Sequence, residues 1–150
     1  MKDFLQLDHQ LCFALYAASR AMTSAYQPLL APLGLTYPQY LVMMVLWEED
    51  GVAVKHLGAR LRLDSGTLTP LLKRLAAQGV IERRRDVVDE RVVRIHLTAP
   101  GRALRRRAAD IPRQLSCRVG LSLPELAKLR TQLARLTDHV HATTDPLEKP

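Results

Sequence analysis

The two cysteines, Cys12 and Cys117, are the side chains of this sequence best suited to redox chemistry, because a thiolate reacts readily with peroxides. They lie 105 positions apart, so no short-spaced pair indicates a metal site or a local redox motif. In a reducing cytoplasm, cysteines this far apart are not expected to form a permanent structural disulfide. Two interpretations stay open at this point: each cysteine is either an inert core thiol or a redox-responsive one.

The bulk properties predict one folding unit with a basic surface. A chain of 150 residues with 47% hydrophobic side chains is long enough for one domain with its own core and short for two. The formal net charge is +7, and much of the excess lies in residues 83–85 and 102–110. Such arginine clusters attract a polyanion, although a solvated basic face has the same composition.

Several classes of protein are not indicated. The N-terminal "MKDFLQLDH" has charges on both sides of a short apolar stretch, so we expect no secretory signal and a cytoplasmic location. Residues 21–47 carry no charge, but Pro28, Pro32, Gly34 and Pro38 divide them into segments too short to cross a membrane. The sequence has no phosphate-binding glycine loop, no nucleophile elbow and no cluster with zinc-ligand spacing. We therefore expect neither an enzyme nor a bound metal or cofactor.

The spacing of apolar residues and helix caps predicts a mainly helical chain. The first element is a long amphipathic helix from near Asp8 to around Pro32. The other predicted elements are a helix from Pro38 to near Gly51, a short helix at 54–63, a helix between Asp64 and Gly79, a β-hairpin at 80–98, a helix from about 99 towards 120 with a bend at Pro112, and a last helix from near Ser122.

This order of elements is that of a winged helix-turn-helix, here mainly α with a small β-hairpin wing and extra helices at both ends. One helix of that fold offers its early exposed residues to DNA bases and packs its other side on the core. The predicted packed side consists of Leu68, Leu71, Leu72 and Leu75. The predicted DNA-facing side chains are Ser65, Thr67, Thr69, Lys73 and Arg74. Pro70 removes one helical donor, so either the helix bends there or its regular part begins at Thr69.

The tip of the predicted hairpin, "DVVDERVVRIHLT", places Asp89 two residues before Arg91. At this spacing the carboxylate can hold the guanidinium extended, and arginine suits insertion into a narrow minor groove. A simple surface ion pair would have the same spacing. The position next to a recognition-type helix favours contact with DNA.

With these elements in place, the chain resembles the MarR family of dimeric winged-helix regulators from about Leu7 to about Val140. The stretch "DERVVRIHLTAPG" matches the wing signature of that family, with Asp89 and Arg91 as its Asp-x-Arg pair. The resemblance implies a single MarR-type domain over residues 1–150. It divides into dimerisation helices at 1–36 and 100–145 and a winged helix-turn-helix DNA-binding region at 37–99.

Two stretches, "LDHQLCFALYAASRAMTSAYQPLLAPLGLTYPQYLVMMVLWE" and "LDSGTLTPLLKRL", closely resemble the organic hydroperoxide sensors of that family, the OhrR repressors. The resemblance implies that Cys12 is the peroxidatic residue and that Tyr26 and Tyr37 of the other subunit hydrogen-bond its thiolate. In one subgroup a second cysteine forms an intersubunit disulfide with the oxidised first one, and Cys117 falls where it is expected. A place early in a helix also favours a thiolate, although a capping Asp8 would oppose it.

The function implied by the resemblance is that of a homodimeric repressor bound to inverted-repeat half-sites of operator DNA. An organic hydroperoxide would oxidise Cys12 and so release the DNA. Two alternatives stay open. One is a MarR-type repressor controlled by a small phenolic or aromatic ligand, with both cysteines incidental. The other is a thiol peroxidase that turns over peroxides as an enzyme, against which the basic wing argues.

Overall fold

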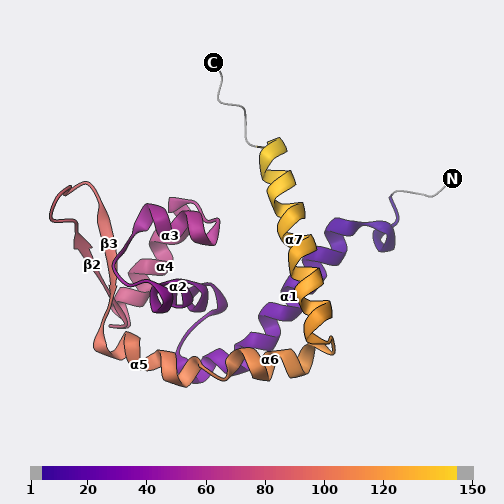
Figure 1. Cartoon of the computed structure of the whole chain (residues 1–150), viewed down its shortest axis with the longest axis horizontal. Coiled ribbons are helices and arrows are strands. Elements are labelled where there is room, and N and C mark those ends of the chain that lie inside the picture. Colours follow the sequence, from indigo (N-terminus) through magenta and orange to yellow (C-terminus); the bar gives the residue numbers. More distant parts are fainter. Residues whose placement is uncertain (1–4, 145–150) are drawn as a thin grey trace, which may run out of the picture. The chain divides into compact units, whose positions relative to one another are not determined.

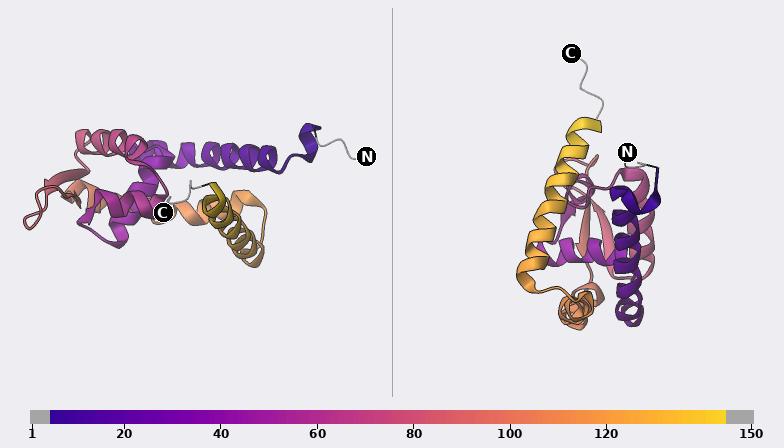
Figure 2. Two further views of the ribbon diagram at one scale, coloured as in Figure 1. Left: turned by 90° about the horizontal axis from the view of Figure 1, so that it is seen from above. Right: turned by 90° about the vertical axis from the view of Figure 1, so that its right-hand side faces the viewer.

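The structure of the protein is a computed structural model that describes residues 5–144 (Figure 1). It divides into two units, residues 1–112 and residues 113–150. In the first unit, the 3-10 turn η1 (Leu7–His9) precedes helix α1 (Leu11–Leu30), which runs out from the packed part of that unit (Figure 2). Among the described residues of α1, only Leu30 is buried.

Helix α1 begins at Leu11, later than the predicted start near Asp8. Asp8 lies within η1, and the extended backbone of Gln10 (φ −90°, ψ 114°) separates that turn from the helix. Gln10 occupies the cap position without a side-chain cap hydrogen bond. Asp8 therefore does not cap α1, and the first turn of the helix contains no acidic residue.

Helix α2 (Tyr37–Glu48) starts with a reciprocal cap. The Oγ1 of Thr36 accepts a hydrogen bond from the N–H of Gln39 at 3.5 Å, and Oε1 of Gln39 accepts one from the N–H of Thr36 at 2.9 Å. Pro38 lies in the first turn, as predicted. The helix ends before the predicted Gly51, because Glu49 already has an extended backbone.

Helices α3 (Val54–Leu61) and α4 (Ser65–Ala77) form the helix-turn-helix pair. Asp64 caps α4 as predicted, since its Oδ1 accepts a hydrogen bond from the N–H of Thr67 at 2.8 Å. Gly79, with a φ of +73°, follows the C-terminal end of α4, also as predicted. Pro70 lies inside the helix, so the regular part begins at Ser65 and not at Thr69.

A small antiparallel sheet forms the wing. Strands β2 (Ile81–Arg85) and β3 (Val93–Leu97) are the predicted hairpin, with Arg83 opposite Ile95. A further strand, β1 (Val52–Ala53), pairs with the other edge of β3 and gives the strand order β1-β3-β2. Two residues are too few to show a period-two pattern, so β1 could not be predicted from the sequence.

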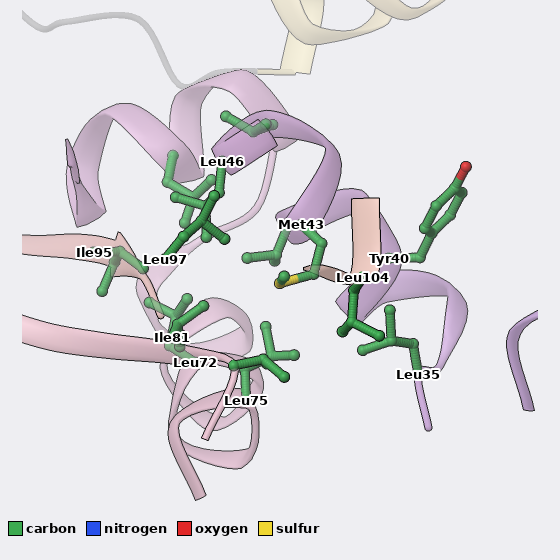
Figure 3. Packing of buried hydrophobic residues seen from close by; sticks show 14 of the residues in the cluster. Leu35, Tyr40, Met43, Leu46, Leu72, Leu75, Ile81, Ile95, Leu97 and Leu104 are labelled. Atoms are coloured by element: carbon green, nitrogen blue, oxygen red, sulfur yellow. The ribbon is translucent and has the colours of Figure 1, made fainter. Parts of the chain in front are cut away.

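The core of the first unit lies between α2, α4, the sheet and α5 (Ala99–Ala108) (Figure 3). The leucines predicted to pack, Leu68, Leu71, Leu72 and Leu75, are all buried. Figure 3 labels two of them, Leu72 and Leu75, together with Leu35, Tyr40, Met43, Leu46, Ile81, Ile95, Leu97 and Leu104 of the same cluster. Gly101 allows α5 to approach closely, because a Cβ at this position would lie 2.0 Å from the carbonyl oxygen of Val80.

The chain after the wing is broken into three helices. The predicted bend at Pro112 is a break between α5 and α6 (Ile111–Val119), two residues earlier than the proline. Pro112 is then the second residue of α6, where a missing N–H has no intrahelical cost. Helix α7 (Leu123–Thr144) follows directly after Ser122, whose hydroxyl and N–H both donate to Oε2 of Glu125. No residue of α7 is buried within the part of the chain that the structure describes.

The predicted division at 1–36, 37–99 and 100–145 depends on a second copy of the chain and stays a prediction. Residues 1–4 and 145 lie outside the described residues.

Within residues 5–144, no single helix is long and apolar enough to cross a membrane. The segments Leu11–Leu33 and Tyr37–Glu48 reach the required length and hydropathy only as a pair, and they are bent by 68°.

Candidate redox and DNA-contact sites

Tyr26 and Tyr37 lie against one another where α1 meets α2. The short turn η2 (Ala31–Leu33) and Gly34, which has a φ of +68°, bend the chain by 68° between the two helices. The N–H of Leu35 also donates to the carbonyl of Leu30 across this corner, at 3.3 Å. The ring centroids of the two tyrosines are therefore only 4.6 Å apart, with the ring planes tilted by 34°.

Both phenols are neutral at physiological pH. Burial raises the pKa of Tyr26 to about 12, with a further contribution from the neighbouring Tyr37 and Tyr40. Burial also raises the pKa values of Tyr37 and Tyr40. A neutral phenol keeps its O–H donor, so the pair can donate two hydrogen bonds to an anion such as a thiolate.

The tyrosine pair continues into a row of aromatic rings that the sequence analysis did not connect. Tyr40 is buried, with 3% of its surface exposed. Its ring centroid lies 5.8 Å from that of Tyr26 and 6.1 Å from that of Trp47. The available signal was the spacing of Tyr37, Tyr40 and Trp47 by three and seven residues, which places them on one helix face.

A cavity of about 450 Å³ borders Tyr37 between α1 and the start of α2. Its lining includes Tyr37 and Leu35 beside polar side chains such as Ser24, Gln27 and Thr36. Both the volume and the mixture of apolar and polar groups are typical of small-molecule sites.

Cys12 is the second residue of α1, and its side chain is exposed in the single chain. It precedes Tyr26 by 14 residues on the same helix, which corresponds to about 21 Å along the axis. Cys12 therefore cannot contact Tyr26 of its own chain. Cys117 lies in α6, belongs to the second unit and is also exposed.

Helix α4 presents its predicted polar side to solvent. Four of the five predicted DNA-facing side chains are exposed, and Thr69 is half-buried because it lies beside the packed leucines. The exposed ones are Ser65, Thr67, Lys73 and Arg74. Strand β2 adds Arg83, Arg84 and Arg85, all exposed, of which Arg84 forms an ion pair with Glu82. The wing and α4 thus carry a concentration of positive charge.

At the wing tip, Asp89 and Arg91 form the predicted pair. Nε and Nη2 of Arg91 donate to the two carboxylate oxygens of Asp89, at 3.0 and 3.1 Å. The side chain of Arg91 remains 90% exposed. This fork geometry holds the guanidinium in place without burying it.

The loop that carries this pair is organised by Asp86, which the sequence analysis did not single out. Its carboxylate accepts hydrogen bonds from the N–H of Val88 at 2.8 Å and of Asp89 at 3.1 Å, and it pairs with the guanidinium of Arg94. These donors lower the pKa of Asp86 to about 2. Arg94 also donates to the carbonyl of Gly51 at 3.0 Å, so the pair ties the wing loop to the turn before β1.

Within residues 5–144, no group of three or more His, Cys, Asp or Glu side chains could hold a metal ion.

An exposed polar recognition helix beside a basic wing is characteristic of DNA-binding regulators. Residues 24–107 match the family of transcriptional regulators SarA/Rot, and the chain belongs to that family of MarR-like winged-helix regulators.

Two relatives cover nearly all of the chain. It is 52% identical over 148 residues to the HTH-type transcriptional regulator TtmR of Methylorubrum extorquens (strain PA1), covering 99% of this chain and 76% of that protein. It is 48% identical over 139 residues to the organic hydroperoxide resistance transcriptional regulator of Bacillus subtilis (strain 168), covering 93% and 95%.

Solved structures of AbfR share the fold. Reduced AbfR bound to DNA has a TM-score of 0.76 and 35% identity, covering 89% of this chain and 93% of that chain. A structure of disulfide-formed AbfR has a TM-score of 0.65 and 34% identity, covering 87% and 92%. The protein is thus a transcriptional regulator with a relative named for organic hydroperoxide resistance.

Proposed function

We propose that the protein is a homodimeric repressor that releases operator DNA when an organic hydroperoxide oxidises Cys12. The observation that carries this proposal is the pair of neutral phenols, Tyr26 and Tyr37, with ring centroids 4.6 Å apart. Since Cys12 of the same chain is about 21 Å from Tyr26 along α1, the thiolate held by the pair is Cys12 of the partner subunit. The name of the Bacillus subtilis relative supports this choice of stimulus.

Exposed apolar side chains on α1 and α7 support a homodimer. Large apolar residues of a single soluble chain are rarely exposed in such numbers along one helix. On α1 they are Leu11, Phe13, Tyr16 and Met22, and on α7 they are Leu123, Leu129, Leu133 and Val140. A second copy of the chain would cover these side chains, and in the proposed dimer it supplies the Cys12 held by the tyrosine pair.

The sensing step transfers two electrons from sulfur to the peroxide. The thiolate of Cys12 attacks the terminal oxygen of ROOH, the O–O bond breaks, and the sulfur becomes a sulfenic acid. The alkoxide RO⁻ leaves and takes a proton from solvent to give the alcohol. The apolar residues Leu11, Phe13 and Leu15 near Cys12 along α1 would favour alkyl hydroperoxides over hydrogen peroxide.

Cys117 of the other subunit, the one whose tyrosine pair held Cys12, then resolves the sulfenic acid. Its sulfur attacks that of Cys12, a disulfide forms between the subunits, and the hydroxyl group leaves as water after taking the thiol proton. The exposure of both thiols and the existence of a disulfide-formed state of AbfR support this step. Withdrawal of Cys12 from the tyrosine pair would alter the spacing of the two recognition helices, which must match half-sites about one duplex turn apart.

The DNA contacts are assigned to α4 and to the wing. Ser65, Thr67, Thr69, Lys73 and Arg74 would face the major groove, and Arg91, held by Asp89, would enter the minor groove. The reduced, DNA-bound AbfR structure supports a DNA-competent reduced state. Because operator DNA is the partner, we infer a cytoplasmic location for the protein.

The cavity of about 450 Å³ beside Tyr37 favours a second candidate function, control of DNA binding by a small phenolic or aromatic ligand.

One experiment separates the candidates. It measures the electrophoretic mobility of DNA from upstream of the protein's own gene in the presence of the protein, with cumene hydroperoxide or with salicylate. We expect the hydroperoxide to release the DNA from the parent protein and to leave the Cys12→Ser complex intact. Release by salicylate together with indifference to hydroperoxide would support the ligand-controlled regulator. Continuous peroxide consumption with a thiol reductant would instead indicate the peroxidase.

A further inference from the structure

The row of aromatic rings that begins at the tyrosine pair ends at a hydrogen bond to α5. The ring of Tyr40 contacts those of Tyr26 and Trp47, with centroid distances of 5.8 and 6.1 Å. Nε1 of Trp47 donates to the carbonyl oxygen of Gly101 at 3.0 Å. Rings on α1 and α2 are thereby connected to the first turn of α5.

That first turn of α5 is fastened to the point where the recognition helix α4 passes into the wing. The hydroxyl of Thr98 donates to the carbonyl of Gly79 at 2.6 Å, and its N–H donates to the carbonyl of Val80 at 3.2 Å. Gly101 packs so closely on Val80 that a Cβ would lie 2.0 Å from its carbonyl oxygen. Any movement of this turn therefore displaces the end of α4 and the start of β2 together.

Free space borders the rings of Tyr40 and Trp47. A cavity of about 240 Å³ lies between α2 and α5, and its lining includes Tyr40, Trp47, Arg105 and Ala108. Close-packed side chains can move only into such space, because protein interiors otherwise allow few alternative arrangements. Tyr40 and Trp47 thus border free space on the side that faces α5.

We infer that Tyr40 and Trp47 are positioning residues that transmit the state of the Tyr26–Tyr37 pair to the recognition helix and the wing. This inference rests on the proposed sensing by Cys12. While a thiolate of the partner is held by the pair, the rings stay in their present contacts and Trp47 holds Gly101. Loss of the thiolate lets Tyr26 and Tyr40 shift, Trp47 follows towards the cavity, and the turn at Thr98 and Gly101 moves with the α4–β2 junction.

The test compares operator affinity before and after peroxide treatment in Trp47→Phe, which keeps an aromatic ring and lacks the N–H donor. Its readout is the ratio of the dissociation constants of oxidised and reduced protein, measured by fluorescence anisotropy of labelled operator DNA. We expect this ratio to fall by about fivefold or more relative to the parent, a typical size for coupling between sites, while the reduced protein binds as before. Glu49→Gln is the matched control, because Glu49 is exposed at the end of α2 and does not line this cavity, and its ratio should stay at the parent value.

A purely structural role for Trp47 would lower the melting temperature of Trp47→Phe and leave the ratio of dissociation constants unchanged, which would overturn the inference.

A second measurement uses the fluorescence of the parent protein, where Trp47 is the only tryptophan. Its emission should change at the rate of DNA release after cumene hydroperoxide and stay constant in Cys12→Ser. DNA release without a change in emission would refute the transmitting role of Trp47 and leave the proposed sensing by Cys12 intact. A parent protein that keeps its DNA in hydroperoxide would refute the proposed sensing itself.

Discussion

Asp89 receives two hydrogen bonds from the guanidinium of Arg91 at the tip of the wing, one to each carboxylate oxygen. The pair holds a charged side chain in position while it remains 90% exposed. An exposed ion pair adds little to folding stability. A prearranged arginine is instead suited to a narrow, strongly negative minor groove.

Arg91→Ala should weaken operator binding by about 10- to 100-fold and reduce the dependence of affinity on salt concentration, because one cation no longer displaces counterions. The melting temperature should stay that of the parent. The measurement is fluorescence anisotropy with labelled DNA over a series of salt concentrations. Val88→Ala is the matched control, since Val88 is 97% exposed in the same loop and uncharged. Equal affinity of Arg91→Ala and the parent at every salt concentration would remove the wing tip from the binding mechanism.

Asp86→Asn should loosen the wing loop, because the carboxylate anchors the N–H groups of Val88 and Asp89 together with Arg94. The folded-state pKa of about 2 lies below the ordinary value of 3.8. The stabilisation by this group is therefore fully present above pH 4 and is lost as the pH falls through 2. Hydrogen exchange at the amides of Val88 and Asp89 should be faster in Asp86→Asn at neutral pH. Its urea unfolding should also depend less on pH between 4 and 2, and identical profiles would contradict the anchoring role.

Tyr37→Phe should slow the oxidation of Cys12 by about tenfold, because the thiolate loses one of its two phenol donors. The measurement is the rate of loss of free thiol after addition of cumene hydroperoxide. Since burial raises the pKa of Tyr26 to about 12, the remaining phenol should stay a donor up to about pH 10, and the rate should show no tyrosine titration below that value. A Tyr37→Phe variant that oxidises as fast as the parent would show that the pair does not bind the thiolate.

Cys117→Ser should abolish the covalent dimer that the parent protein forms after treatment with organic hydroperoxide. Non-reducing electrophoresis detects that dimer, and peptide mapping should find a Cys12–Cys117 link. Without a resolving thiol, Cys12 would stop at sulfenic acid or proceed to sulfinic acid. Recovery of DNA binding by dithiothreitol would then be incomplete at excess peroxide. If Cys117 is only a surface thiol, the serine variant would oxidise, release DNA and recover like the parent.

The recognition helix could be predicted almost completely from the sequence. The spacing of Leu68, Leu71, Leu72 and Leu75 identifies its buried face, and Asp64 and Gly79 mark its ends. These signals are local, because caps and one-sided helices depend on residues within a few positions of each other. The hairpin and its Asp89–Arg91 pair are local features for the same reason.

The tertiary structure alone decided which distant residues meet. Strand β1 exists because Val52 pairs with Ile95, and the wing loop is anchored to the chain at Gly51 through Arg94. The contact of Trp47 with Gly101 spans 54 positions, and Tyr26 reaches Tyr40 only because the chain bends at η2. Periodicity describes one element at a time, whereas these contacts follow from how α1, α2, α5 and the sheet pack around one core. The sequence therefore determined the elements and their faces, and packing decided how the tyrosine pair connects to the recognition helix.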